Sequence, residues 1–329
     1  MTSGLYEVRP YAAWTATDRI DNKVLSSLTV ILKTSGCSWN RCRMCSYRHV
    51  RIGAVEERDL IDQLLAQVSW VRDHFHMEEI ECVKIYTSGS FFDPVEVPLP
   101  ARNALGTLFR GKIVIAETRP EFVIPDRIAS FREITDDGSH DIPLYIAMGL
   151  ETRDDRIREK CINKGFSWED FLRASKTARS AGAGVKAYLL LKPPFLTERE
   201  SIDDAISSIK ALQGIADMVS LNPCSVQNGT ELEYYWKRGE FRPPYLWSIL
   251  SILSRAQGHI LCDPLDGGRE RGAHNCGMCD RSILQGIRDY SLSGDRDLVE
   301  GLLEMECACK EEWKFVLENE RSYCMPLTR

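Results

Sequence analysis

Three cysteines near the front of the chain constrain it more than any other feature. They follow the order Cys37-x4-Cys42-x2-Cys45. Iron–sulfur clusters of the [4Fe–4S] type are held by cysteine thiolates, usually one for each iron. A trio of thiolates therefore leaves one iron without a protein ligand, and catalytic metal sites keep such a position open for a small molecule. The spacing predicts a reactive [4Fe–4S] cluster at these three residues.

The same trio would also suit a structural zinc site completed by a distant fourth ligand, and the spacing alone does not separate the two interpretations. An aromatic residue, Tyr47, lies two positions after Cys45. With it, the loop resembles the cluster loop of the radical S-adenosylmethionine (SAM) enzymes, although its x4 gap departs from the commonest x3 spacing. The resemblance implies that the open iron binds the amino and carboxylate groups of SAM. It also implies that an electron from the cluster cleaves SAM to methionine and a 5′-deoxyadenosyl radical.

The composition fits an enzyme whose cysteines stay reduced. The chain has 329 residues, of which 43% are hydrophobic, enough for one large core and a small appendage. Its twelve cysteines cluster in metal-binding patterns rather than in a disulfide ladder. Residues 1–20 contain no apolar core of signal-peptide length, and no run reaches the roughly 18 apolar residues of a membrane span. We therefore expect a cytoplasmic protein without a membrane partner, and the net charge of −6 excludes a chain that is basic throughout.

Short apolar runs alternate with helical patterns along the first two thirds of the chain. Strands are predicted at 28–32, 81–86, 112–116, 144–148, 184–191 and 218–221. This alternation favours a parallel sheet with right-handed crossovers, and the continuous apolar runs fit strands buried on both faces. The predicted fold class is α/β, a partial TIM-type (β/α)6 barrel with its site at the C-terminal ends of the strands. We expect this core barrel at 1–240 and a small, mainly helical, metal-binding extension at 241–329.

Polar or small residues follow all six predicted strands. Each one alone is an ordinary turn residue, but six such ends in register are hard to explain by packing. Small residues also let the backbone approach a ligand closely. Besides the cysteine loop, the predicted cofactor-binding residues at these ends are Ser88, Gly89, Ser90, Glu117, Arg119, Glu151, Lys192 and Asn222.

Longer motifs make the resemblance more specific. The segments 87–91 (TSGSF), 117–122 (ETRPEF) and 149–165 resemble the radical SAM half of the Elongator catalytic subunit, and the likeness continues through 191–198 and 242–247. Two features depart from Elongator, namely the shorter cysteine spacing and the lack of a following acetyltransferase domain. Taken with the cysteine loop, the segment GAHNCGMCD that ends at Asp280 is similar to the RaSEA family, the archaeal radical SAM enzymes of archaeosine synthesis.

The RaSEA resemblance implies a substrate and partners. In that family the substrate is tRNA whose position 15 carries a preQ0 base conjugated to lysine by an ArcS-type lysine transferase. Cleavage of the lysine adduct, as by a lyase, leaves the formamidine group of archaeosine on the base. The lysine side chain has unactivated C–H bonds, so a primary carbon radical is needed, and the protein supplies placement and exclusion of water. A reductant protein such as ferredoxin or flavodoxin is expected as the electron donor.

A second metal site is predicted near the C-terminus. His274, Cys276 and Cys279 form a His-x-Cys-x2-Cys motif, and Cys262 upstream would complete four ligands, as in a closed structural zinc site. A second iron–sulfur cluster, or free thiols that cap a loop, are the alternatives. Cys307 and Cys309 fall in a helix predicted at 297–318 and should not face one direction. They are expected to be plain core or surface thiols, as are Cys82, Cys161 and Cys324, while Cys224 at a strand end is ambiguous.

Arginines concentrate beside both predicted metal sites, and guanidinium groups pair with phosphate through two donors. The candidate tRNA contacts are Arg41, Arg43, Arg48, His49 and Arg51 near the cluster, and Arg269, Arg271 and Arg281 near the second site. Two other functions remain open from the sequence. One is a radical SAM enzyme that acts on a small molecule or another tRNA base, and the other is a non-catalytic zinc-binding adaptor.

Overall fold

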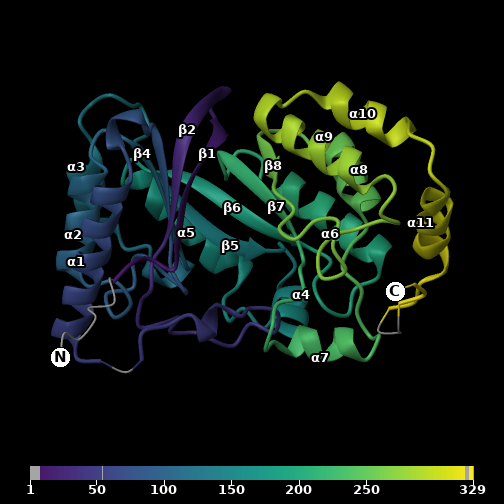
Figure 1. The fold of residues 1–329 in the computed structure, drawn as a ribbon, viewed down its shortest axis with the longest axis horizontal. Coiled ribbons are helices and arrows are strands. Elements are labelled where there is room, and N and C mark those ends of the chain that lie inside the picture. The colour runs from purple at the N-terminus through teal and green to yellow at the C-terminus, as the bar shows by residue number, and fades with distance from the viewer. Residues whose placement is uncertain (1–7, 54, 323–325, 329) are drawn as a thin grey trace, which may run out of the picture.

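The computed structural model describes residues 8–53, 55–322 and 326–328. In this part of the chain, eight strands form one curled sheet and follow one another across it in chain order (Figure 1). The first two strands are antiparallel, and every later neighbour is parallel. The strands are β1 (Ala12–Ile20), β2 (Lys23–Ile31), β3 (Cys82–Tyr86), β4 (Ile113–Thr118), β5 (Leu144–Glu151), β6 (Gly184–Leu191), β7 (Met218–Pro223) and β8 (Ile260–Cys262).

Helices flank the sheet, with α1 to α3 beside its first half and α8 to α11 beyond its last strands (Figure 1). Their bounds are α1 (Glu57–His74), α2 (Leu99–Leu108), α3 (Pro125–Thr135), α4 (Asp155–Ile157), α5 (Trp168–Ser180), α6 (Glu198–Ala211), α7 (Glu231–Lys237), α8 (Leu246–Arg255), α9 (Asp280–Ser293), α10 (Arg296–Glu304) and α11 (Ala308–Asn319). Capping boxes begin α5 at Ser167 and α6 at Thr197. None of the helices in the described ranges has the length and apolar character needed to cross a membrane.

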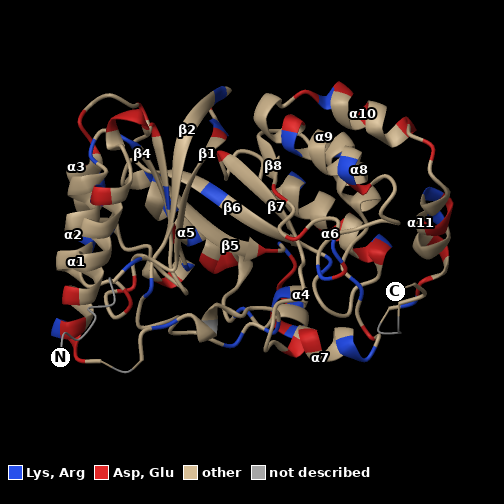
Figure 2. Ribbon diagram, viewed as in Figure 1, with Lys and Arg blue, Asp and Glu red and all other residues tan. Residues whose placement is uncertain are grey.

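The two faces of the sheet differ because successive side chains of a strand point to opposite faces. On β6, Val185, Ala187 and Leu189 belong to the large core beneath the helices. The alternate residues Lys186 and Tyr188 line the cavity on the inner face, and the basic position of β6 is visible as a blue band in Figure 2. Apolar packing thus holds the helices outside, while the inner face keeps polar groups for a ligand.

All six predicted strands are present, which confirms the predicted class of half-barrel, and two further strands were not predicted. Residues 14–17 in the middle of strand β1 are exposed. The turn that follows β1 places Asp21 and Asn22 at φ +47° and +61°, as a tight hairpin requires. Strand β8 has only three residues. It pairs with β7 although it lies beyond residue 240, so the division at 240/241 stays a prediction.

The predicted helix at 297–318 is wrong in its middle. The chain leaves the helical conformation at Met305 and re-enters it after Cys307, whose φ and ψ of −155° and 136° are extended. Two short helices, α10 and α11, therefore replace one long one. The break changes where Cys307 and Cys309 point, as described below.

Candidate active site

A cavity of about 720 Å³ lies at the C-terminal ends of the parallel strands. Cys37, Cys42 and Cys45 line it, in the loop that follows β2. The lining continues past the ends of β3, β4, β5 and β7 to residues of β1, β8 and α9. One continuous space therefore joins the three thiols to the far wall of the half-barrel.

The cysteine loop is tethered to three other parts of the molecule. The Trp39 indole N–H donates to the Asn163 carbonyl over 2.7 Å, and the Arg43 amide donates to the Ile162 carbonyl over 3.0 Å. The Ser46 hydroxyl donates to the Gln227 amide oxygen over 2.7 Å. The third tether of the loop is a hydrogen bond from the Ser38 hydroxyl to the Asp93 carboxylate. These contacts fix the loop so that its thiols face the cavity.

Glu96 joins the cysteine loop to the segment after β3, and sequence reasoning missed it. Its fully buried carboxylate accepts hydrogen bonds from the Thr34 hydroxyl at 2.8 Å, the Gly89 amide at 2.9 Å and the Ser90 amide at 2.6 Å. Burial raises the pKa of this carboxyl, and the hydrogen bonds oppose that rise. A lone glutamate inside the apolar stretch FFDPVEV was the sequence signal.

The three predicted residues after β3 have different surroundings. Gly89 is packed against the cysteine loop, because a Cβ there would lie 2.7 Å from the Cα of Cys37. Ser88 lines the cavity and donates its hydroxyl hydrogen bond to the Val50 carbonyl. Ser90 is not in the lining, and its hydroxyl accepts from the Arg119 amide at 3.1 Å. Gly89 and Ser88 thus remain candidates for cofactor contact, whereas Ser90 positions the neighbouring strand end.

Glu151 and Lys164 form a buried ion pair in the cavity wall, with 2.6 Å between the carboxylate and the ammonium. Glu151 ends β5 after a bulge and has φ +67°, a left-handed conformation that is rare for a side chain of its size. A Cβ on Gly149 would lie 2.6 Å from the Lys164 ammonium, so the glycine makes room for the pair. Burial lowers the pKa of Lys164, but the Glu151 carboxylate and the nearby Cys42 thiol outweigh it, so the net pKa is raised.

Glu117 and Arg119, at the end of β4, both line the cavity. Burial raises the pKa of Glu117 to about 7, although Lys164 opposes the rise. The Arg119 guanidinium lies between two rings, 5.2 Å from the centroid of Trp39 and 5.3 Å from that of Phe166. It also donates to the Lys164 carbonyl over 2.9 Å. Arg119 therefore holds in place the segment of the cavity wall that contains Lys164.

The predicted residues at the ends of the last two strands differ in their relation to the cavity. Asn222 lines the cavity, and its side-chain oxygen accepts from the Ser220 hydroxyl at 3.2 Å. Lys192 is not in the lining, since its ammonium pairs with the buried Glu198 carboxylate at 2.6 Å. Lys192 therefore stabilises the end of β6 from outside the cavity and does not face the cavity itself.

The far wall of the cavity carries charges that the sequence did not reveal. The Lys84 ammonium lies 2.5 Å from the Asp18 carboxylate, which also accepts from the Ser27 hydroxyl at 2.6 Å. Burial lowers the pKa of the neighbouring Lys186 to about 8. Trp14 of β1, 46% exposed, adds an aromatic ring to the lining. Trp14 and Asp18 were missed because β1 was not predicted, and Lys84 and Lys186 were missed because they lie inside β3 and β6, not at the ends of these strands.

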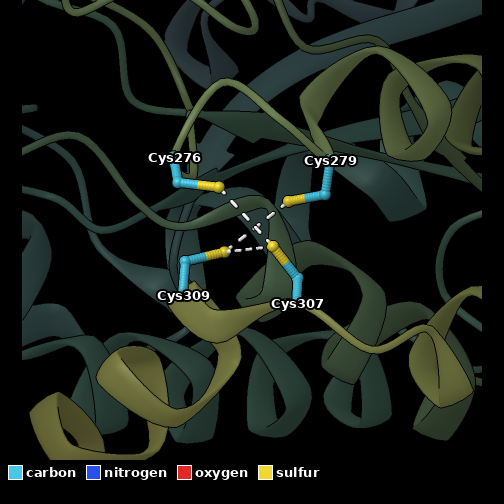
Figure 3. Close-up of side chains that lie close together, drawn as sticks. All are labelled: Cys276, Cys279, Cys307 and Cys309. Carbon is cyan, nitrogen blue, oxygen red and sulfur yellow. Dashed lines mark hydrogen bonds between the residues drawn. The ribbon is translucent and has the colours of Figure 1, made fainter.

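The C-terminal ligand set differs from the predicted one. Among the described residues, one set of His, Cys, Asp and Glu side chains brings all its ligand atoms within 4.8 Å of one another, and it comprises Cys276, Cys279, Cys307 and Cys309 (Figure 3). Cys307 and Cys309 belong to it because the chain is extended at Cys307, which turns both thiols to one side. The prediction that these two thiols should not face one direction is therefore wrong.

Cys262 and His274 are not members of this four-cysteine set. Cys262 instead lines the cavity, and its amide donates to the Ser291 hydroxyl over 3.0 Å. The His274 Nδ1 lies 2.8 Å from the Gly272 carbonyl oxygen. Of the other cysteines, Cys224 also lines the cavity, Cys82 and Cys161 are buried, and Cys324 lies outside the described residues.

Two of the predicted tRNA-binding arginines are held by α7. Arg43 pairs with Glu231 at 2.5 Å, and Arg271 pairs with Glu233 at 2.7 Å. Charges of both signs along α7 are visible in Figure 2. Arg269 is largely exposed, with only a 3.5 Å contact to Asp266. Arg41 is exposed beside the Trp39 ring, and nothing is described of the Arg48 side chain.

A half-barrel with a three-thiol loop at the C-terminal ends of its strands is the arrangement predicted for a radical SAM enzyme. No protein-family model matches the chain. The archaeosine synthase subunit beta of Methanosarcina acetivorans is 38% identical over 323 residues, which cover 94% of this chain and 90% of that protein. The archaeosine synthase subunit beta of Thermococcus kodakarensis is 34% identical, covering 93% of this chain and 96% of that protein. The chain therefore belongs to the archaeosine synthase subunit beta family, which confirms the predicted resemblance.

Among solved structures, an N-terminally truncated Elp3 of Methanocaldococcus infernus is similar to this chain. It matches with a TM-score of 0.49 and 17% sequence identity, covering 78% of this chain and 59% of that chain.

Proposed function

We propose that this protein is a radical SAM lyase of tRNA modification, which cleaves the lysine adduct of preQ0 at position 15 and leaves the formamidine group of archaeosine. The observation that carries the proposal is the placement of three thiols, from a chain of this family, on one large cavity. A cavity of about 720 Å³ lies within the range of small-molecule sites. A non-catalytic adaptor has no need of such a space beside its thiols.

The residues fit a [4Fe–4S] cluster with one open iron. Cys37, Cys42 and Cys45 supply three thiol ligands on one side of the cavity, and the glycine at position 89 lets the backbone after β3 pack directly behind Cys37. Burial raises the pKa of Cys45 to about 11, so a cation is needed to hold that ligand as a thiolate. When bound, the cluster and SAM supply a primary carbon radical that can remove hydrogen from an unactivated C–H bond.

The walls next to the cysteine loop offer complementary charge to SAM, which carries an amino group, a sulfonium and a carboxylate. Glu117 and Glu151 present carboxylates to its cationic groups, and the Lys164 ammonium is placed for an anionic one. Ser88, Gly89 and Asn222 add short polar contacts. We assign SAM binding to these six residues, with Ser90, Arg119 and Lys192 in supporting positions.

The far wall is suited to the substrate. A lysine adduct carries a free amino acid group, and the pair of Asp18 and Lys84 offers one partner for each of its charges. Lys186 adds a second cation on the same side. The exposed ring of Trp14 is placed to stack on a base, an interaction worth about 1–3 kcal/mol. Substrate and cofactor would then meet in the middle of one cavity, in the near-attack geometry that hydrogen transfer needs.

The proposed reaction requires other proteins. An ArcS-type lysine transferase supplies the adducted tRNA, and a reductant such as ferredoxin or flavodoxin supplies the electron. Four of the predicted arginines are exposed, and we assign the tRNA phosphate contacts to them: Arg41, Arg51, Arg269 and Arg281.

The test is an anaerobic reaction of the reconstituted protein with SAM, a reductant and lysine-adducted tRNA, followed by mass analysis of the nucleosides. Archaeosine should form together with 5′-deoxyadenosine, whereas tRNA carrying unconjugated preQ0 should remain unchanged. Asp18→Asn should lower archaeosine formation at least tenfold while Asp137→Asn, an exposed control far from the cavity lining, should not. If SAM is cleaved but the adduct persists, the proposed substrate is wrong.

A further inference from the structure

The four-cysteine set, Cys276, Cys279, Cys307 and Cys309, has the dimensions of a site for a single metal ion. Three sulfur–sulfur distances are 3.5 Å for Cys276 to Cys307, 3.6 Å for Cys279 to Cys309 and 3.4 Å for Cys307 to Cys309 (Figure 3). Four thiolates around zinc, with bonds of about 2.3 Å in a tetrahedron, lie about 3.8 Å apart. The sulfurs therefore surround a centre close to the size that zinc requires.

A four-iron cluster would need a wider arrangement. Each thiolate of such a cluster binds a different iron, so the sulfurs stand outside the corners of a cube and not around one atom. All four sulfurs here lie within 4.8 Å of one another. A tetrahedral set of four sulfurs is typical of zinc, and a fourth protein ligand leaves no open position for chemistry.

Buried hydrogen-bond donors from the surrounding structure support the sulfurs. The Asn275 side-chain amide donates to Cys279 over 3.3 Å, and the Trp247 indole N–H donates to Cys309 over the same distance. Lys310 follows Cys309 in the chain, and its ammonium lies 5.4 Å from the centroid of the same Trp247 ring. Such donors suit a site with four thiolates around a divalent ion, because its net charge is negative.

The set brings together two segments that are separated in the chain by α9 and α10. Cys276 and Cys279 lie in the loop before α9, while Cys307 and Cys309 lie at the start of α11. Helix α11 stands at the edge of the molecule (Figure 1). A metal ion bound here would fasten the first turn of α11 to the body of the protein.

Helix α11 in turn reaches the back of the candidate active site. The Trp313 indole N–H donates to the Ser248 hydroxyl over 2.9 Å. Ser248 donates to the buried Glu198 carboxylate over 2.5 Å, and Glu198 pairs with Lys192 just after β6. Lys192 is itself held at φ +58°. A chain of buried polar contacts thus runs from α11 to the end of a barrel strand.

We propose that Cys276, Cys279, Cys307 and Cys309 bind one zinc ion in a closed structural site that fastens α11 to the half-barrel. This inference stands independently of the proposed reaction. It replaces the ligand set with Cys262 and His274, and it predicts no direct part of the zinc in the reaction.

Metal analysis of the full-length protein tests the proposal. In a background in which Cys37, Cys42 and Cys45 are all alanine, the protein purified anaerobically should hold about one zinc per chain and no labile sulfide. Adding Cys307→Ser or Cys309→Ser should remove that zinc. Adding Cys262→Ser or His274→Gln should leave it, because neither residue belongs to the set. Iron with sulfide in this background would overturn zinc in favour of a second cluster, and iron without sulfide would overturn it in favour of a mononuclear iron site.

A second measurement avoids variants that fail to fold. Cys276 is exposed, so its thiol should react readily with an alkylating reagent when no metal holds it. In the protein without substitutions, mass mapping should find that Cys276 is protected from alkylation. Removal of the zinc by a chelator should increase the alkylation rate of Cys276 at least tenfold. Equal reactivity before and after chelation would contradict the site.

Discussion

The two cysteine groups of this protein contain similar local motifs in contrasting surroundings. Both contain a Cys-x2-Cys pair, but the N-terminal trio faces a cavity of about 720 Å³ while the four-cysteine set gathers its sulfurs within 4.8 Å of one another. Among the described residues, the trio forms no such compact set. The difference indicates that ligand number and adjoining space, more than cysteine spacing, separate a reactive centre from a structural one.

The residues around the two cysteine groups also differ, in backbone strain and in buried charge. Around the trio, the structure keeps strained and costly groups, such as Glu151 at φ +67° and a Glu117 whose pKa burial raises to about 7. Around the four-cysteine set, Asn275 and Trp247 donate hydrogen bonds to two of the four sulfurs, those of Cys279 and Cys309. Strain and buried charge are concentrated where a ligand would use them.

The largest expected effect separates the two centres outright. Changing Cys37, Cys42 or Cys45 to Ala should abolish the brown [4Fe–4S] absorption and all SAM cleavage, since each thiolate holds one iron. Zinc content should be unchanged. The iron content, the zinc content and the yield of 5′-deoxyadenosine are measured for each soluble variant. An unchanged iron content in any one of the three variants would contradict the assignment of these cysteines as cluster ligands.

The opposite variant tests the structural centre. Cys309→Ser should remove zinc and lower the free energy of unfolding by on the order of 3–5 kcal/mol, because metal-binding energy is folding energy in such sites. SAM cleavage without tRNA should persist, because the four-cysteine set lies outside the cavity lining. Denaturation monitored by tryptophan fluorescence measures the loss, with Cys262→Ser as the matched control. Equal losses in both variants would mean that Cys309 acts only as a buried thiol.

Lys186 gives a pH-dependent test of the cavity. Burial lowers its pKa in the folded protein from 10.5 to about 8. The unfolded chain therefore binds more protons between these two pH values, so stability should rise as the pH increases through that window and stay level below it. Lys186→Met should abolish that rise and add on the order of 3 kcal/mol at pH 7, before any packing cost. Denaturation at several pH values tests this, and a variant with the same slope as the parent would contradict the assignment.

Glu151 tests the cofactor side of the same cavity. Glu151→Gln should weaken SAM binding about ten- to a hundredfold, because a hydrogen bond to a charged group is worth about 1.5–3 kcal/mol. The iron content should stay at the parent level. Equilibrium binding of SAM to the reconstituted protein measures the change, and Glu78→Gln, on a well-exposed side chain, is the control. Unaltered affinity would reduce Glu151 to a structural partner of Lys164.

The smallest effect concerns tRNA. Arg269→Gln should reduce the slope of log affinity against log salt by about one, since one phosphate contact is lost. Arg271→Gln should instead loosen α7, because Arg271 pairs with Glu233 and lies 4.5 Å from the Trp236 ring centroid. The affinity of each variant for tRNA is measured over a series of salt concentrations, with Lys176→Gln, at an exposed position, as a control. An unchanged slope for Arg269→Gln would place tRNA docking elsewhere, such as at Arg41.

The sequence predicted what depends on local pattern. Six buried strands and the residues at their ends followed from apolar runs and turn chemistry. Nine of the described residues that line the cavity were on that list, namely Cys37, Cys42, Cys45, Ser88, Gly89, Glu117, Arg119, Glu151 and Asn222. Strand β1 was missed because an exposed edge strand needs no apolar pattern. With it, Trp14 and Asp18 of the far wall were missed as well.

Contacts between distant segments were harder to predict. Lys164 reaches Glu151 only because the loop after α4 folds back against Trp39, and a Cβ on Gly165 would lie 2.2 Å from that ring. Cys307 and Cys309 looked incompatible with one site because helical periodicity was extended across Met305. Once the helix is broken there, the two thiols share a side with Cys276 and Cys279. The error came from a local conformation that tertiary contacts decide.

The central claim is that the trio holds a cluster with an open iron, while the four-cysteine set holds a closed site. The most direct measurement is the electron paramagnetic resonance spectrum of the chemically reduced, anaerobic protein, recorded before and after addition of SAM. The account predicts one paramagnetic [4Fe–4S] cluster per chain whose spectrum changes when SAM is added, because SAM binds the open iron. Either a cluster spectrum that SAM leaves unchanged or a second cluster signal that survives loss of Cys37, Cys42 and Cys45 would contradict it.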